Sequence, residues 1–227
     1  MNRRHFLSLP FLGAAARLRL DALAANAPNI KITGIGQLRL QFPGKTPRRR
    51  NSIIASGGGP PGMTQLELYT DAGITGRSIP AGNWSLIERE AFPRVKGENP
   101  FFVERIWDRM YHHNRKPVAK GAYITAMGSI DIAVWDIIGK ALNLPVYKVL
   151  GAYDEKIRVY AAGGYYEEGK GLKELAKEVE EYVGEGFRAV KMKVGGEPMS
   201  VDVERVRAVR DAVGPKVDIL IDANNKW

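Results

Sequence analysis

The stretch between residues 157 and 222 constrains the fold of this chain more than any other part of the sequence. Three apolar segments predict strands there: 157–162, 188–194 and 217–222. Two segments with apolar residues at helical spacing separate these strands: 171–183 and 200–213. Strands that alternate with helices at intervals of about thirty residues are typical of a parallel sheet flanked by helices.

The middle strand carries two lysines, Lys191 and Lys193, on one face, because side chains alternate along a strand. In an open sheet helices cover both faces, and two buried lysines would be costly. In a closed (β/α)₈ barrel that face looks inward, and its C-terminal end opens into the active site. The lysines therefore favour a barrel. The alternative is an open flavodoxin-like sheet, for which Gly163-Gly164-Tyr165-Tyr166 is a weak phosphate- or flavin-binding turn.

The strand ends also suggest a chemistry. Asp222 ends the third strand and Asn224 follows it, so the carboxylate and the lysines should meet at one rim of the sheet. Two ammonium groups two residues apart repel by about 2.5 kcal/mol, which would lower the pKa of one lysine by roughly two from about 10.4. Such a lysine is a usable general base, and a carboxylate suits Mg²⁺. Base and metal together can remove a proton next to a carboxylate through an enolate.

The N-terminal half has a different organisation. Alternating apolar residues predict strands at 29–40, 63–69 and 74–79, and helical spacing follows at 85–115 and, most regularly, at 121–142. Strands followed by helices predict a small α+β domain. A segment at 41–62, rich in glycine and proline, interrupts the strands and is expected to be a loop.

Three motifs together resemble a known family. They are Gly128 to Gly151 (G-S-I-D-I-A-V-W-D-I-I-G-K-A-L-N-L-P-V-Y-K-V-L-G), then K-M-K, then D-A-N. This combination resembles the enolase superfamily, specifically the mandelate racemase/muconate lactonizing enzyme group, over about residues 29–227. The resemblance implies an α+β capping domain at 28–152. The first part of a modified TIM-type α/β barrel, with three of its eight strands, would follow at 153–227.

The resemblance also implies roles for individual residues. Lys193 would be the general base, Lys191 the neighbour that tunes it, Asp222 the first Mg²⁺ ligand, and Asn224 a substrate contact. The loop at 43–62 would correspond to the specificity loop of the cap. Its three consecutive arginines would then bind an acidic substrate: Arg48, Arg49 and Arg50.

The implied function is Mg²⁺-dependent abstraction of a proton alpha to a carboxylate in a small molecule. Dehydration of an acid sugar, racemisation and cycloisomerisation would all fit. Family members take two further acidic ligands and a second acid or base from later strands, so this chain is expected to be an incomplete, inactive fragment. The full-length protein is expected to form a homo-oligomer. The alternative is a non-catalytic binding or interaction module derived from such an enzyme.

The charge distribution argues against a nucleic-acid partner. The net charge is +9, but residues 1–50 hold ten of the 34 lysines and arginines and one of the 25 acidic residues. The remaining 24 of each balance over residues 51–227, whereas a nucleic-acid-binding domain carries a basic face.

The N-terminal residues contain a motif that predicts the cellular compartment of the protein. Arg3-Arg4-x-Phe6-Leu7 and an apolar run resemble a bacterial twin-arginine export signal, with a small-residue cleavage site at Ala25-Asn26-Ala27. We therefore expect residues 1–27 to be a signal peptide and the protein to be periplasmic or otherwise exported; the alternative is a basic tail on a cytoplasmic protein. The sequence contains no run of eighteen or more apolar residues, so it predicts no membrane-spanning helix.

Overall fold

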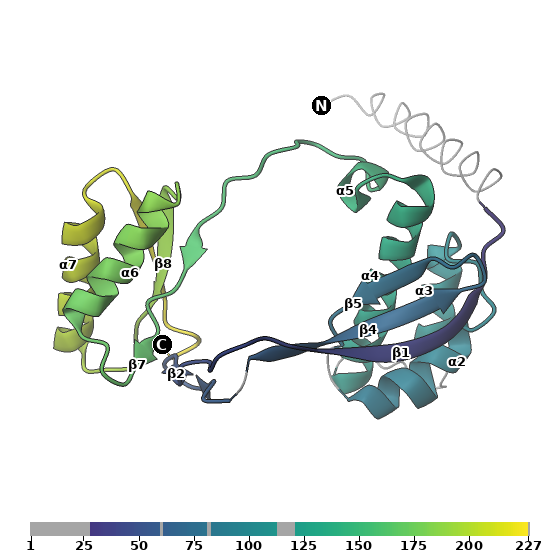
Figure 1. Cartoon of the computed structure of the whole chain (residues 1–227), viewed down its shortest axis with the longest axis horizontal. Coiled ribbons are helices and arrows are strands. Elements are labelled where there is room, and N and C mark those ends of the chain that lie inside the picture. The colour runs from purple at the N-terminus through teal and green to yellow at the C-terminus, as the bar shows by residue number, and fades with distance from the viewer. Residues whose placement is uncertain (1–27, 60, 81–82, 113–120, 227) are drawn as a thin grey trace, which may run out of the picture. The chain divides into compact units, whose positions relative to one another are not determined.

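The computed structural model describes residues 28–59, 61–80, 83–112 and 121–226 (Figure 1). The predicted signal peptide at 1–27 lies outside these residues. The chain forms two compact units, one of residues 1–40 and 63–153 and the other of residues 41–62 and 154–227.

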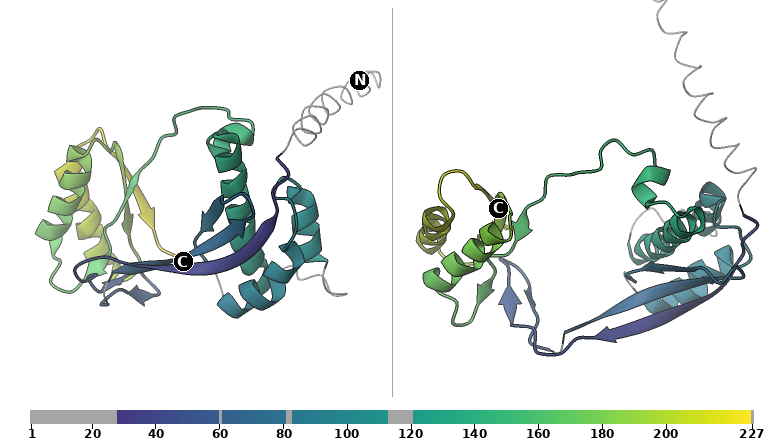
Figure 2. Two further views of the ribbon diagram at one scale, coloured as in Figure 1. Left: turned by 45° about the vertical axis from the view of Figure 1, so that its right-hand side comes forward. Right: turned by 45° about the horizontal axis from the view of Figure 1, so that its top comes forward.

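The first unit is built on a three-stranded sheet in the order β1-β4-β5. The strands are β1 (Ile32–Gln41), β4 (Gly62–Thr70) and β5 (Thr75–Ser78), close to the predicted positions, and β4 and β5 run antiparallel. The helices lie on one face of this sheet (Figure 2). They are η2 (Leu86–Ala91, a π-helix), α2 (Phe92–Val95), α3 (Val103–Tyr111), α4 (Ala122–Leu142) and α5 (Val146–Val149).

Helix α4 forms the core of the first unit. Its residues at spacings of three and four, including Ala126, Ile130 and Ile137, are fully buried and pack with Leu66 and Leu68 of β4. The helix ends at Asn143, which adopts a left-handed conformation. Helix α4 is also long and apolar enough to cross a membrane. However, 56% of its most apolar 18-residue stretch is buried, which is typical of the central helix of a folded unit.

Gly76 allows the close approach of β5 to α4. A Cβ atom on Gly76 would lie 2.1 Å from the carbonyl oxygen of Ala133 and 2.7 Å from Cγ1 of Ile137. We therefore expect Gly76→Ala to destabilise the protein by about 2–3 kcal/mol. Gly128→Ala lies within α4, and apart from the helix's own backbone and its chain neighbours no described atom lies within 4 Å of the new methyl group, so this change should instead stabilise the protein by about 1 kcal/mol. Denaturant unfolding compares the two; a Gly76→Ala variant as stable as the parent would contradict this packing.

The second unit contains three parallel strands in the order β6-β8-β9: β6 (Ala161–Ala162), β8 (Ala189–Lys193) and β9 (Asp218–Asp222). Helices α6 (Leu172–Gly184) and α7 (Met199–Val213) lie between them in sequence and cover one face of the sheet (Figure 1). On that face Val190, Met192 and Val194 are buried against residues of both helices. The predicted β-α-β-α-β order is therefore confirmed.

The first strand of this sheet is much shorter than predicted. Only Ala161 and Ala162 pair with β8, and the rest of the predicted 157–162 strand is extended without pairing. The reason is register: because Ala161 pairs with Val190, residues 157–159 lie beyond Ala189, the first residue of β8. Ile157 is accordingly 86% exposed.

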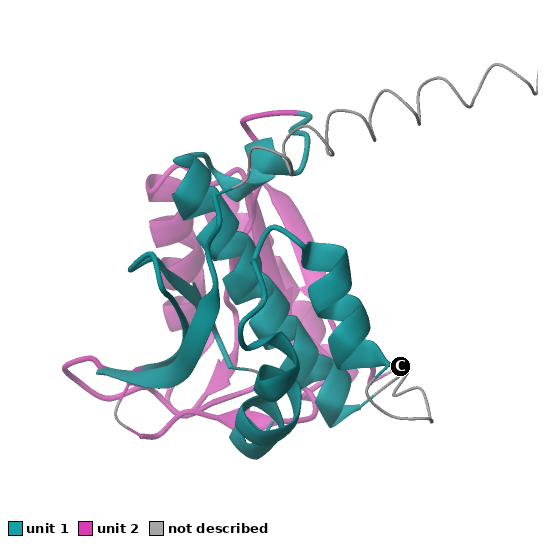
Figure 3. Ribbon diagram, turned by 90° about the vertical axis from the view of Figure 1, so that its right-hand side faces the viewer, with its two compact units in different colours: residues 1–40, 63–153 teal, residues 41–62, 154–227 magenta. Residues whose placement is uncertain are grey.

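The segment 41–62 belongs to the second unit and is not simply a loop (Figure 3). It contains β2 (Arg49–Arg50) and β3 (Ala55–Ser56), which pair antiparallel with each other. Strand β2 also pairs antiparallel with β7 (Tyr166–Glu167), which directly follows the first barrel-like strand. The sequence predicted that this segment is part of the capping domain. Its docking on β7 was not foreseen because strands of two residues have no periodicity to detect.

Candidate functional site

Lys191, Lys193 and Asp222 meet at the C-terminal ends of β8 and β9. The parallel register pairs Lys193 with Asp222 across the two strands. Nζ of Lys193 donates to Oδ2 of Asp222 at 2.7 Å, and Nζ of Lys191 lies 3.1 Å from the same oxygen. Two ammonium groups therefore share one carboxylate oxygen. The structure brings together the base, its neighbour and the metal ligand that the sequence predicted.

The shared oxygen sets the electrostatics of the site. Hydrogen bonds from Lys193, from the Asn224 backbone and from Lys191 hold the pKa of Asp222 well below its ordinary value. The hydrogen bond to Asp222 raises the pKa of Lys191. For Lys191, the attraction of the carboxylate thus outweighs the repulsion between the two amines.

Two aromatic rings lie beside the ammonium groups. Nζ of Lys191 is 5.6 Å from the ring centroid of Tyr160, and Nζ of Lys193 is 5.3 Å from that of Tyr165. Both distances are in the range of cation–π attraction. With side-chain exposures of 12% for Lys193 and 27% for Lys191, Lys193 is the more enclosed of the two.

Asn224 adjoins Asp222 in a left-handed conformation, with φ of 49°. Its backbone N–H donates to Oδ1 of Asp222 at 2.9 Å. Its side-chain Oδ1 is buried and has no hydrogen-bond partner among the described residues. A buried oxygen without a partner is costly in a folded protein, so this atom is suited to a ligand.

Two of the three consecutive arginines, Arg49 and Arg50, form β2, and Arg48 directly precedes this strand. Arg49 pairs with Glu167 at 3.2 Å and lies 6.0 Å from the Tyr165 ring that also faces Lys193. Arg50 donates to the carbonyl oxygen of Gly196 at 2.9 Å and forms an ion pair with Glu197. Together with Arg48 they line a hollow of about 590 Å³. Carboxylates of this chain thus already engage two of the three arginines that were predicted to bind substrate.

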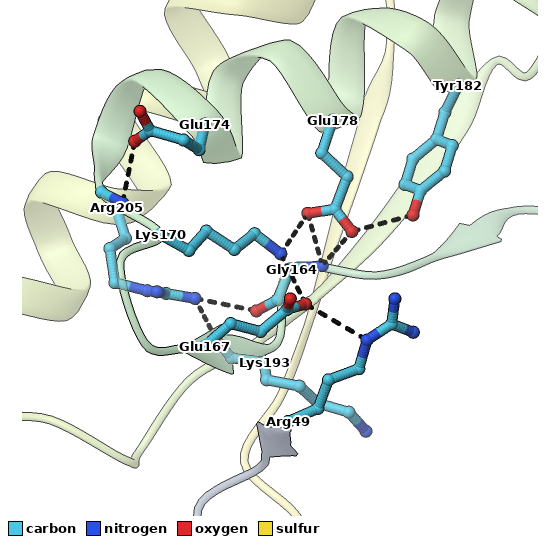
Figure 4. A network of polar contacts seen from close by, with 10 residues as sticks. Arg49, Gly164, Glu167, Lys170, Glu174, Glu178, Tyr182, Lys193 and Arg205 are labelled. Atoms are coloured by element: carbon cyan, nitrogen blue, oxygen red, sulfur yellow. Dashed lines mark hydrogen bonds and ion pairs between the residues drawn. The ribbon is translucent and has the colours of Figure 1, made fainter. Parts of the chain in front are cut away.

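A second layer of polar contacts surrounds β7 (Figure 4). Nζ of Lys170 is 3.2 Å from Oε1 of Glu167 and 2.7 Å from Oε2 of Glu178. The Tyr182 hydroxyl group donates to Oε1 of Glu178 at 2.8 Å. Sequence reasoning missed this layer, since its members are scattered over 16 positions and show no motif. It also missed Tyr166, Asp202 and Arg205, although an Asp-x-x-Arg pair on a helix that covers the sheet could have indicated the last two.

The residues at the rim fit part of a magnesium site. Oδ1 of Asp222 accepts one backbone hydrogen bond, and the neighbouring Asn224 Oδ1 has no partner in the described part of the chain. Both are oxygen donors of the kind that Mg²⁺ takes. Among the described residues, however, no three His, Cys, Asp or Glu side chains cluster as a full metal site would need.

Comparisons with known proteins agree with this geometry. Residues 61–151 match the sequence model of the mandelate racemase/muconate lactonizing enzyme N-terminal domain, and residues 174–227 match that of the enolase C-terminal domain-like family. Arabinonate dehydratase of Saccharolobus solfataricus is 40% identical over 62% of this chain and 38% of its own length. N-succinyl-L-Arg/Lys racemase of Bacillus cereus is 30% identical over 87% of this chain and 53% of its own length.

A solved structure extends the match. A mandelate racemase/muconate lactonizing enzyme from a marine actinobacterium, in complex with magnesium, has a TM-score of 0.68 and 29% identity, covering 88% of this chain and 54% of that one. This chain therefore spans about half the length of the solved relative, and between 38% and 53% of the two curated ones. Both domain matches and the fold agree: the chain belongs to the mandelate racemase/muconate lactonizing enzyme group of the enolase superfamily.

Proposed function

We propose that this chain carries the base and one metal ligand of a Mg²⁺-dependent enzyme that removes a proton alpha to a carboxylate. The observation that carries this proposal is the Asp222 oxygen shared by the ammonium groups of Lys191 and Lys193. The site lies at the C-terminal ends of parallel strands, where barrel enzymes hold their catalytic groups.

Lys193 is proposed as the base because it is the more enclosed lysine and bonds the shared oxygen directly. Lys191 remains an ammonium, since Asp222 raises its pKa. Magnesium, when bound to Asp222 and Asn224, would supply positive charge that stabilises the charge developing on the substrate's carboxylate.

A sugar acid is the proposed substrate, and dehydration the proposed reaction. The 40% identity to an arabinonate dehydratase supports this assignment. The arginines on and beside β2 (Arg48, Arg49, Arg50) would provide polar contacts to the acid and its hydroxyl groups. Racemisation is the second candidate, because a racemase matches over 87% of this chain.

Catalysis is proposed to require carboxylates in addition to Asp222. Mg²⁺ takes an octahedral set of oxygen ligands, and the described residues near the rim contribute one carboxylate and one amide oxygen. We therefore propose that the 227-residue chain by itself does not turn over a substrate.

Proton exchange tests the proposal most simply. The full-length protein would be incubated with Mg²⁺ and a panel of sugar acids in D₂O and followed by NMR. We expect loss of the α-proton signal with one member of the panel. Dehydration would remove the β-hydroxyl group and give a 2-keto-3-deoxy acid, whereas racemisation would return deuterated starting acid. Retention of every α-proton, across sugar acids and N-acylated amino acids alike, would reject the proposal.

A further inference from the structure

Three polar side chains are buried together behind the proposed base. Tyr166, Asp202 and Arg205 are 6%, 5% and 6% exposed. The guanidinium of Arg205 lies 4.0 Å from the ring centroid of Tyr166, and its Nε is 3.6 Å from Oδ1 of Asp202. A buried ion pair brings no net stability on its own account, so a role for this cluster must come from the groups that it bonds.

The cluster bonds the backbone that immediately follows Lys193. Oδ2 of Asp202 accepts the N–H of Gly195 at 2.7 Å. The hydroxyl group of Tyr166 donates to Oδ1 of Asp202 at 2.6 Å and accepts the N–H of Gly196 at 3.0 Å. The turn after β8 is therefore held from one side by two buried side chains.

Arg205 holds Lys193 itself. Its Nη2 donates to the carbonyl oxygen of Gly164 at 2.8 Å and lies 3.5 Å from that of Lys193 (Figure 4). In a regular parallel ladder the Lys193 carbonyl would accept an N–H from the next residue of β6. The Gly164 carbonyl still accepts the Lys193 N–H at 3.3 Å, but Gly164 has φ of +60°, and Nη2 of Arg205 lies beside the Lys193 carbonyl.

We infer that Arg205, fixed by Asp202 and Tyr166, is a positioning residue that holds the end of β8 so that the Lys193 ammonium meets Asp222. Its catalytic meaning rests on the proposed function, but the placement of the ammonium does not. A planar guanidinium can donate to two carbonyl groups in fixed directions, which a lysine or an apolar side chain cannot do. Displacement of a catalytic group by about 1 Å can cost about a hundredfold in rate.

The test follows the ammonium group of Lys193 directly. In the ¹⁵N-labelled 227-residue chain, its ¹H–¹⁵N signal is assigned by its loss in Lys193→Met, and its proton exchange with water is measured. We expect Arg205→Met to speed this exchange about tenfold, since the hydrogen bond to Asp222 is loosened. Should Arg205→Met fail to fold, Arg205→Lys takes its place, with an expected increase of about threefold.

Arg210→Met is the matched control. Arg210 lies on the same helix and also donates to backbone carbonyl groups, those of Gly214 and Val217, but near the C-terminal end of α7 and away from Lys193. We expect a similar loss of stability and an unchanged Lys193 signal. A signal unchanged in the folded Arg205 variant, or equally altered by Arg210→Met, would overturn the inference.

Kinetics on the full-length enzyme separate this inference from the proposed function. Arg205→Met should lower kcat about tenfold to a hundredfold with KM within about twofold. If the parent enzyme shows no proton exchange but the ammonium signal responds as expected, the proposed function fails and the positioning role stands. If exchange occurs and the ammonium signal ignores Arg205, the positioning role fails alone.

Discussion

Replacing Lys193 by methionine should lower the rate of α-proton exchange in the full-length enzyme about a thousandfold, because the general base is removed. Methionine has an unbranched side chain of similar length, so the side chain at position 193 should still lie between Tyr165 and Asp222 and β8 should keep its packing. Exchange of the substrate's α-proton with D₂O, followed by NMR, measures the loss. Binding of the substrate should weaken far less than turnover, since Lys193 acts on the transition state.

Lys191→Met is the control for this experiment, since Lys191 contacts the same carboxylate oxygen. It should lower the rate about tenfold at neutral pH and move the pH–rate profile to higher pH, because a positive charge that opposes protonation of the base is lost. Equal losses in both variants, with no movement of the profile, would show that neither lysine is the base.

Replacing Asp222 by asparagine should weaken Mg²⁺ binding to the full-length protein by at least about a hundredfold, as judged by calorimetry. An amide keeps the shape of the side chain but loses the charge that a divalent cation needs. The same change should return the pKa of Lys191 toward its ordinary value, since the carboxylate is what raises it.

Asp218→Asn is the matched control for Asp222→Asn. Asp218 begins the same strand at its opposite end and pairs with Arg158 on the surface. We expect Mg²⁺ binding to be unaffected there. Comparable losses in both variants would mean that general electrostatics, and not coordination by Asp222, governs the affinity.

The alternation of side chains was enough to predict that Lys191 and Lys193 lie on the same face, because it depends only on the period of a strand. Lys191 and Lys193 follow from that period, and Asp222 follows from the parallel arrangement that the strand–helix rhythm dictates. The effect of Asp222 on Lys191 could not be predicted, because it depends on one shared oxygen at 3.1 Å. Periodicity predicts on which face of a strand a side chain lies, whereas the distances between its atoms and those of other strands depend on tertiary packing.

Long-range pairing accounts for the other differences. The docking of β2 on β7 joins residues more than a hundred positions apart through strands of two residues each. Arg205 reaches the carbonyl groups of Gly164 and Lys193 from α7 through tertiary packing, which no local pattern predicts. The unpaired residues of the predicted 157–162 strand have the composition of a strand but no neighbour at their register.

The shared carboxylate also gives the protein a defined pH dependence. The folded-state pKa of Asp222 is lowered, so its contribution to stability is present above its unfolded value of about 3.9 and is lost as pH falls through the folded value. The pKa of Lys191 is raised, so its contribution is present below about 10.4 and is lost as pH rises through the folded value. The cluster should therefore stabilise the fold across the whole neutral range.

Titration of the Asp222 carboxyl carbon by ¹³C NMR, in the 227-residue chain, tests the convergence of these groups most directly. We predict a pKa well below the ordinary value of about 3.9, and a rise toward that value when Lys191 and Lys193 are both replaced by methionine, with the Asn224 backbone hydrogen bond still lowering it. An Asp222 carboxyl group that already titrates near 3.9 in the parent chain, unmoved by the double substitution, would contradict the account.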